Sequence, residues 1–172
     1  MTEPKPWLPD RKILIVEFDD GVELLLKQLN AALERIPTEQ GIEILNYLES
    51  ASQFGHTPII EWSNMWGPSD AIGQFVPAEF ILKFRSDELC FYPDNAFQWI
   101  IAHEFAHVYQ KAIGRKPGGE SEQENEREAD GIAKDWGFNC FSAGLIVRNQ
   151  FDNGTSVEEA CENAREIDGL IL

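Results

Sequence analysis

Residues 100–108 read IIAHEFAHV and contain the pattern H-E-x-x-H, in which His103 and His107 are four positions apart. On an α-helix, side chains four residues apart lie one turn above each other, so the two imidazoles would face the same side. Two neutral imidazole nitrogens placed in this way can bind one Zn²⁺ at about 2.0–2.1 Å. Glu104 would lie beside the metal, where a carboxylate can act as general base on a zinc-bound water. The stretch therefore predicts a helix with two metal ligands and a base.

Helix start and stop signals lie on both sides of this stretch. Asn95 with Gln98 three positions later is typical of a helix start, and Gly114 is typical of a helix end. Upstream, residues 11–56 are predicted to hold one strand followed by two helices, over residues 22–36 and 38–54. A short apolar, β-branched run indicates the strand, and apolar residues at helical spacing indicate the helices. We find no catalytic pattern in this N-terminal part.

The segment that precedes the motif favours a small sheet. Residues 57–63, 71–76 and 88–92 are short, aromatic or β-branched, and separated by Pro, Gly and Asp. Residues 80–84 fit either a further strand or a helical turn. After the motif, residues 139–172 are expected to be helical. The order of elements predicts an α+β fold with a small mixed sheet, the motif helix and then further helices.

Length and composition favour a single domain over residues 1–172. The chain has 43% apolar and 26% charged residues, which is ordinary for a globular protein and unlike a disordered one. Within this domain we expect a flexible lead-in at residues 1–10, the N-terminal strand and helices, the sheet and metal-site helices over residues 57–138, and the C-terminal helical part. The oligomeric state is left open.

The formal net charge is −16, from 30 acidic and 14 basic side chains. A field of this sign repels phosphate backbones, so we expect no nucleic acid partner, whereas a basic or neutral substrate is favoured. Three cysteines without a close-spaced pair fit reduced thiols better than a disulfide framework. The chain begins with a polar, Pro-rich segment and has no apolar run of membrane-spanning length. These features predict a cytoplasmic protein that does not bind a membrane.

A catalytic zinc site needs a third protein ligand and one open position. The metzincin pattern H-E-x-x-H-x-x-G-x-x-H is excluded, because its Gly and last His correspond to Gln110 and Ile113 here. No histidine follows His107 in the sequence. The third ligand is therefore expected to be a carboxylate or a cysteine.

An acidic segment downstream offers several carboxylates. They are Glu122, Glu124, Glu126, Glu128 and Asp130. Such a run is usually a solvated helix face. Glu126 and Asp130, however, are four apart and share a face flanked by apolar residues, and the small Ala129 would allow a close approach to the motif helix. Ser121 with Glu124 predicts that this helix starts with a capping box.

The H-E-x-x-H motif is followed at residues 125–130 by NEREAD, which fits N-E-x-x-[SA]-D. This pair of motifs resembles the gluzincins, zinc peptidases of the thermolysin type. It is also similar to the minimal gluzincins and the ImmA/IrrE-type peptidases, over roughly residues 88–138. The resemblance implies a zincin-like domain in which Glu126 is the third zinc ligand. It further implies that Asp130 orients a ligand histidine through its other ring nitrogen.

The sequence departs from the larger gluzincins in one respect. Those enzymes carry a further C-terminal His or Tyr that stabilises the oxyanion, and no histidine lies beyond His107 here. Tyr109, Tyr92 or Arg148 would have to take this role, or no residue does. Tyr109 lies two positions after His107 and so off the ligand face of the helix.

We therefore expect a zinc-dependent peptidase that hydrolyses a protein or peptide substrate. His103, His107 and Glu126 would bind Zn²⁺, and Glu104 would take a proton from water and pass it to the leaving amine. Two alternatives stay open. The protein could be a zinc-binding regulatory or interaction module with little or no peptidase activity, or a latent peptidase blocked by residues 1–10 or by the acidic segment.

Overall fold

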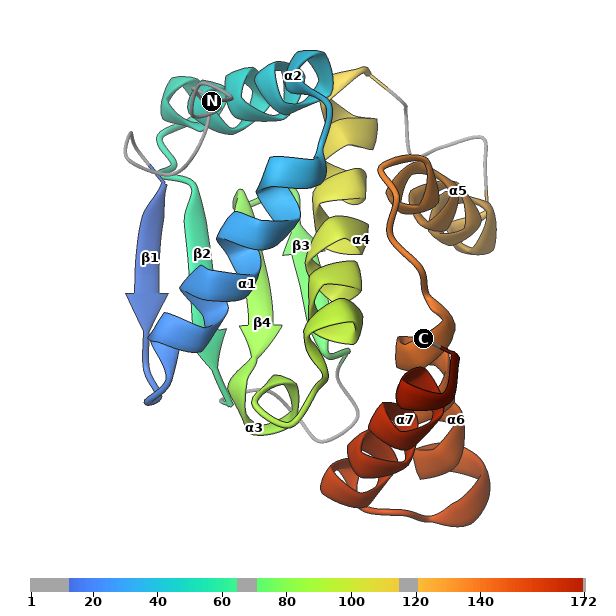
Figure 1. The fold of residues 1–172 in the computed structure, drawn as a ribbon. Coiled ribbons are helices and arrows are strands. Elements are labelled where there is room, and N and C mark those ends of the chain that lie inside the picture. Colours follow the sequence, from blue (N-terminus) through green and yellow to red (C-terminus); the bar gives the residue numbers. More distant parts are fainter. Residues whose placement is uncertain (1–12, 65–70, 115–120, 172) are drawn as a thin grey trace, which may run out of the picture.

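The computed structural model describes residues 13–64, 71–114 and 121–171. Within these residues the chain forms a four-stranded mixed sheet with helices before and after it, which confirms the predicted α+β class (Figure 1). In chain order the elements are β1 (Leu14–Glu17), α1 (Val22–Arg35), α2 (Thr38–Glu49), the 3₁₀ helix η1 (Ser50–Phe54), β2 (Ile59–Ser63), β3 (Gly73–Val76), β4 (Ile81–Arg85), α3 (Ser86–Leu89), α4 (Asp94–Ala112), α5 (Glu122–Asp135), α6 (Phe141–Asn153) and α7 (Val157–Ile171).

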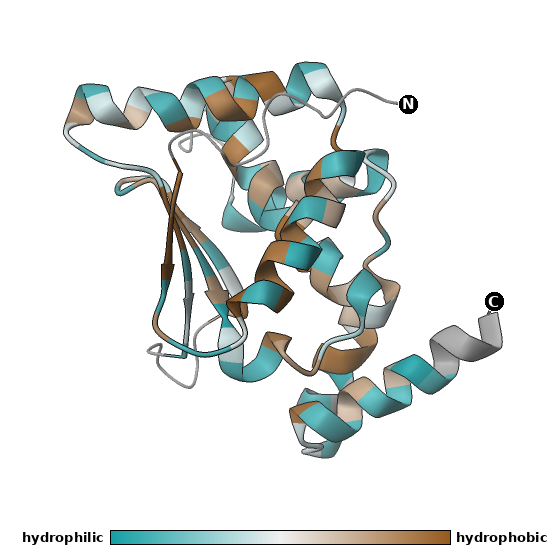
Figure 2. Cartoon of the chain, turned by 60° about the vertical axis from the view of Figure 1, so that its left-hand side comes forward, coloured by the Kyte–Doolittle hydropathy of each residue, from teal (hydrophilic) through white to brown (hydrophobic). Residues whose placement is uncertain are grey.

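The strand order in the sheet is β1-β2-β4-β3. β1, β2 and β4 are parallel to one another, whereas β3 pairs with β4 in the antiparallel direction, with Gln74 opposite Lys83. Helices cover one face of this sheet, as the side view shows (Figure 2). Strand side chains point alternately to the two faces, and large apolar ones fill the helix-covered side. They are Ile60, Trp62, Phe75, Leu82 and Phe84.

Helix α4 runs through the centre of the molecule and packs against α1, α2, α5, α6 and β3. It is apolar on most sides, and Ile101, Ala102, Phe105 and Ala106 are almost completely buried. A helix that is buried around most of its circumference has one defined position, because each face must match a different neighbour. The H-E-x-x-H motif is therefore built into the core.

The prediction of a strand over residues 88–92 is wrong. This segment contains the end of the short helix α3 and a turn, in which the Phe91 and Tyr92 amides donate to the carbonyls of Glu88 and Leu89. Asp87 and Glu88 lie in the first helical turn, where acidic side chains are favourable, and both form ion pairs with Arg85. Of the aromatic residues that suggested a strand, Tyr92 is buried and Phe91 packs partly buried against the core.

Residues 80–84, for which two structures were open, belong to a strand. β4 lies inside the sheet and pairs with β2 on one side and β3 on the other. The helix predicted over residues 38–54 ends earlier, at Glu49, and continues as η1. Gly55 then ends the helical segment with a left-handed φ of 76°.

The expected helical C-terminal part consists of α6 and α7, separated at Gly154. The predicted lead-in at residues 1–10 lies outside the described part of the chain. Cys90, Cys140 and Cys161 form no disulfide. None of the described helices is both long and apolar enough to cross a membrane.

Candidate metal centre

Helix α4 carries both motif histidines on one face, as their spacing predicts. The Nε2 atoms of His103 and His107 are 3.1 Å apart, and the two rings meet edge to face with centroids 4.7 Å apart. Both side chains are mostly buried, with 12% and 19% of their surface exposed. The histidines therefore form a prearranged pair of nitrogen donors.

Helix α5 brings the third group to this pair. Its first turn has the predicted capping box, in which the Ser121 hydroxyl accepts from the Glu124 amide and the Glu124 carboxylate accepts from the Ser121 amide. From this helix the carboxylate of Glu126 reaches His103 Nε2 at 3.0 Å and His107 Nε2 at 3.3 Å. One ligand atom from each of the three residues lies within 4.8 Å of the others, so the group could hold a metal ion.

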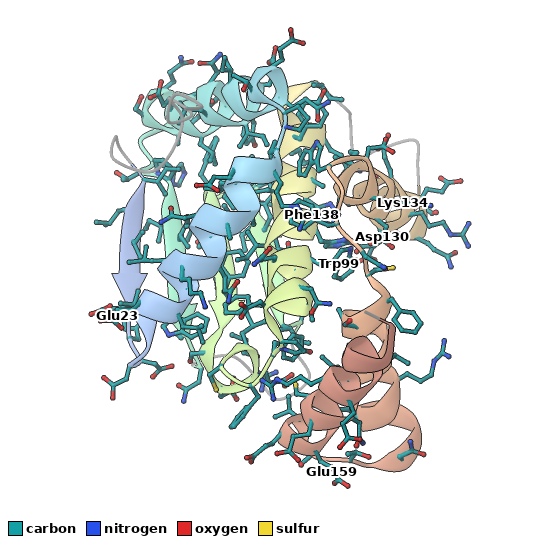
Figure 3. The ribbon with its side chains drawn as sticks, viewed as in Figure 1. Glu23, Trp99, Asp130, Lys134, Phe138 and Glu159 are labelled. Atoms are coloured by element: carbon teal, nitrogen blue, oxygen red, sulfur yellow. The ribbon has the colours of Figure 1, made fainter. Side chains whose placement is uncertain are left out.

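The outer nitrogen of each histidine is also engaged. Asp130, one turn after Glu126 on α5, lies 2.9 Å from His103 Nδ1. The side-chain oxygen of Gln110 lies 2.8 Å from His107 Nδ1. Asp130 is found in the gap between α5 and the N-terminal half of α4, close to Trp99 in projection (Figure 3).

The chemistry of these groups fits a metal ion. An ionised carboxylate only accepts hydrogen bonds. The contact of His103 Nδ1 with the Asp130 carboxylate therefore places the hydrogen of a neutral His103 on Nδ1 and leaves a lone pair on Nε2. Burial and the nearby His107 lower the pKa of His103, and Glu126 and Asp130 oppose part of this shift. A neutral ring is the form that binds a metal. Two imidazole nitrogens and a carboxylate form a donor set that suits zinc.

Glu104 lies beside this group, and only 6% of its surface is exposed. Burial, and secondarily the charge of Glu126, raise the pKa of Glu104 to about 8, while a hydrogen bond from the Phe75 backbone lowers it. β3 approaches this side chain closely. A Cβ atom added at Gly73 would lie 3.0 Å from Glu104 Cγ and 3.1 Å from its Oε1. Only a glycine leaves room for the carboxylate at this point of the strand.

These residues line an open cleft with a cavity volume of about 570 Å³. One side of the cleft consists of residues 71–75, which include most of β3. The other side consists of the first turns of α5, with Glu122, Asn125, Glu126 and Asp130, and α4 forms the floor. The predicted metal ligands and the predicted base therefore share one accessible cleft.

The three candidates for an oxyanion-stabilising residue lie elsewhere. Tyr109 packs against Trp136, with ring centroids 6.2 Å apart, and Tyr92 is buried with 4% of its surface exposed. Arg148 lines a neighbouring cavity that shares Trp99 and Asp130 with the cleft. Among the described residues that line the cleft there is no tyrosine and no arginine.

Three cleft residues were not anticipated from the sequence as parts of the site. Trp99 packs on His103 with ring centroids 5.2 Å apart. Lys111 lines the cleft, and its position four residues after His107 was a signal that could have revealed it. Gln110 bonds to His107 across one helical turn. Its other contacts depend on where α5 lies, which no local pattern indicates.

Comparison with models of known protein families, with curated proteins and with solved structures gave no match.

Proposed function

We propose that this protein is a zinc-dependent peptidase. One observation carries the proposal: His103 and His107 of α4 converge with Glu126 of α5 to within 4.8 Å, beside the buried carboxylate of Glu104. Two histidines and a glutamate, with a further carboxylate next to them, match the requirements of metal-assisted amide hydrolysis. The paired motifs and the α+β architecture also support assignment to a zincin-like, gluzincin-type fold with relatives among the minimal gluzincins and ImmA/IrrE-type peptidases.

His103, His107 and Glu126 would hold the metal ion. When bound, zinc would supply Lewis acidity, which activates water and polarises the scissile carbonyl. Asp130 keeps the Nε2 atom of His103 directed at the metal position by accepting from Nδ1. The groups that bind the metal are thus oriented by this chain alone.

Glu104 is the general base in this proposal. Its carboxylate accepts a proton from the attacking water and later donates it to the leaving amine. A carboxyl group with a pKa near the working pH can do both, and burial raises the pKa of Glu104 to about 8 in the metal-free protein. Nearby positive charge would lower this value, which favours the ionised form that starts the reaction.

β3 is the proposed binding edge for an extended peptide. It is the last strand of the sheet, and its backbone pairs with β4 on one side only. Its residues line the cleft next to Glu104. A peptide strand could therefore add to β3 by backbone hydrogen bonds and lie across the metal position. Glu122 and Asp130 on the opposite side, together with the net charge of −16, favour a basic peptide.

The proposal is tested by metal analysis of the purified protein and of the His103→Ala variant. We expect about one zinc per chain in the wild type and none retained after dialysis in the variant. The His56→Ala variant is the matched control, because His56 is the third histidine of the chain and lies next to Phe80, away from the cleft. A wild-type protein that binds no zinc would contradict the proposal.

Catalysis is tested separately with Glu104→Gln and a library of quenched fluorescent peptides. We expect this variant to bind zinc as the wild type does and to lose hydrolysis. If the variant still cleaves, the assignment of Glu104 is wrong; if the wild type cleaves no peptide of the library, the peptidase proposal is contradicted.

One observation favours a second candidate function. The described cleft residues include no tyrosine, arginine or further histidine, the residue types considered above for stabilising an oxyanion. A zinc-binding interaction module with little peptidase activity would need none. Such a module would bind zinc, retain a basic peptide from the library in the cleft and release it uncleaved.

A further inference from the structure

Gln110 links the two helices of the metal centre through its side-chain amide. It lies on α4 one turn after His107, and only 6% of its surface is exposed. Its amide makes three hydrogen bonds, one within α4 and two to α5. A buried side-chain amide with so many partners has one orientation, because each donor and acceptor must be matched.

The partners on α5 determine which way the amide points. Gln110 Nε2 lies 3.0 Å from the backbone oxygen of Asn125 and 2.8 Å from the Glu128 carboxylate. Both of these are acceptors, so the NH₂ group must face α5. In the flipped orientation, the amide oxygen would face two other oxygens without a hydrogen between them. The Oε1 atom of Gln110 is therefore the atom that faces His107.

This orientation determines the tautomer of His107. Gln110 Oε1 lies 2.8 Å from His107 Nδ1 and can only accept, so Nδ1 must carry the hydrogen. In the neutral ring, Nε2 then has a free lone pair, and this atom is the one that faces Glu126 at 3.3 Å. A bond from the second ring nitrogen also raises the basicity of the nitrogen that binds a metal.

The same amide also fixes the position of Glu126. Asn125, whose backbone oxygen accepts from Gln110, directly precedes Glu126 in the sequence. The bond therefore holds the α5 backbone next to α4 at the residue before the candidate ligand. At the Nδ1 atoms the two histidines differ: Nδ1 of His103 contacts α5 directly through Asp130, whereas Nδ1 of His107 is linked to α5 through Gln110.

We infer that Gln110 is the positioning residue of the metal centre: it sets the tautomer of His107 and holds Glu126 in reach of both histidines. This inference rests on the proposed metal site. It goes beyond that site because Gln110 is not one of the proposed metal ligands.

The inference is tested with Gln110→Met, which keeps the length of the side chain and removes all three hydrogen bonds. Zinc affinity is measured by competition with a chromophoric chelator. We expect it to fall by about 10- to 100-fold, the effect typical of losing the outer partner of a metal ligand. Gln123→Met is the matched control, because Gln123 is an exposed residue of α5.

A second measurement reports the tautomer directly. Long-range ¹H–¹⁵N spectra of the zinc-loaded wild type should show His107 protonated at Nδ1, with slow exchange of that hydrogen. In zinc-loaded Gln110→Met, exchange of the hydrogen should be much faster. If the Met variant does not fold, Gln110→Asn, which is one methylene shorter, is measured in the same two ways.

The outcomes separate this inference from the proposed function. If the wild type binds no zinc, the metal site itself fails. If the wild type binds zinc and the folded variant binds it equally well, or if zinc is bound through Nδ1 of His107, the metal site stands and the role of Gln110 is overturned. Weaker zinc binding together with faster Nδ1–H exchange supports it.

Discussion

The cleft has two walls that are built on different principles. The α5 wall acts through exposed, charged side chains: 52% of the Glu126 side chain and 49% of the Asp130 side chain are accessible, and both bond to His103. The β3 wall acts through its backbone and through close packing, with Gly73 buried against Glu104 and Ile100. The α5 wall contributes carboxylate groups, and the β3 wall contributes a backbone without a side chain next to Glu104.

This difference indicates how the tasks of the site are divided. A change on α5 removes a donor or acceptor and should act on metal affinity. A change on β3 adds volume next to Glu104 and should act on the reaction without altering the metal. Substitutions in each wall therefore test whether the two tasks are separate.

The largest effect is expected for Glu126→Ala on α5. The variant removes the only carboxylate within reach of both histidine Nε2 atoms among the described residues. Zinc affinity should fall by more than the roughly 10- to 100-fold that is typical of losing a residue that hydrogen-bonds to a metal ligand. Chelator competition measures this. Glu122→Ala, a cleft residue of the same helix, should leave the affinity within about threefold of the wild type.

The next largest effect is expected for Gly73→Ala on β3. The new Cβ would lie 3.0 Å from both Glu104 Cγ and Ile100 Cγ2, so the base must move. A small displacement of a catalytic group can reduce the rate by about 10²-fold. We expect a loss of this size in kcat/KM for a cleaved peptide, with unchanged zinc affinity. A parallel loss of zinc would show that the walls are coupled.

Gly131→Ala is the matched control for this substitution. A Cβ at Gly131 would have no atom within 4 Å, and this glycine lies inside α5. The variant should keep full activity, and its free energy of unfolding should rise by about 0.5–1 kcal/mol, because alanine is the better helix former.

A smaller effect on the α5 wall is expected for Asp130→Ala. His103 would lose the acceptor at Nδ1, so zinc affinity should fall by about 10- to 100-fold. Asp130→Asn keeps an acceptor and should recover part of this loss. Asp135→Ala, an exposed acidic residue near the end of α5, controls for the change in charge. Equal affinities of the Asp130→Ala and wild-type proteins would rule out the orienting role.

The smallest effect concerns the stability of the metal-free protein. Since the pKa of Glu104 is raised from 4.5 to about 8, the native state holds a proton that the unfolded state releases. The free energy of unfolding should therefore fall as the pH rises from about 4.5 to 8, and change no further from this group above that range. Glu104→Gln removes this dependence and should therefore be more stable than the wild type at pH 8.

Urea unfolding of the wild type and of Glu104→Gln, both with chelator, measures this difference across the pH range. Taking the difference cancels the titration of the histidines to a first approximation. Identical curves for the two proteins would mean that the Glu104 carboxyl is not desolvated.

The parts of the fold that the sequence predicted well are those with local signals. The helix with the H-E-x-x-H motif and the capping box at Ser121 follow from residue spacing, and the structure contains both elements. The strand prediction for residues 88–92 is wrong because aromatic residues that belong to the core are also typical of strands, and sequence alone does not distinguish the two. β3 could not be identified as the edge strand, because strand order depends on pairing between distant segments.

The difference between local signals and contacts of distant segments also applies to the site. The sequence supplied His103, Glu104 and His107 from one motif, and the resemblance added Glu126 and Asp130. The structure brings these residues together, whereas their roles stay predictions. In the sequence, Gln110 is informative only as the residue that breaks the metzincin pattern. Its contacts with Asn125 and Glu128 arise from the crossing of two helices, which single-sequence patterns do not contain.

Helix α5 buries little apolar surface in the core, since Ala129 and Ala133 are its only fully buried described residues. Elements with few buried apolar contacts open more easily than the rest of a domain, on the timescale seen by hydrogen exchange. Because Glu126 belongs to α5, a zinc ion would bind the docked helix and not the undocked one. Zinc should therefore slow amide exchange throughout α5 and leave the exchange of α1 unchanged, so that the metal would act as part of the fold as well as of the chemistry.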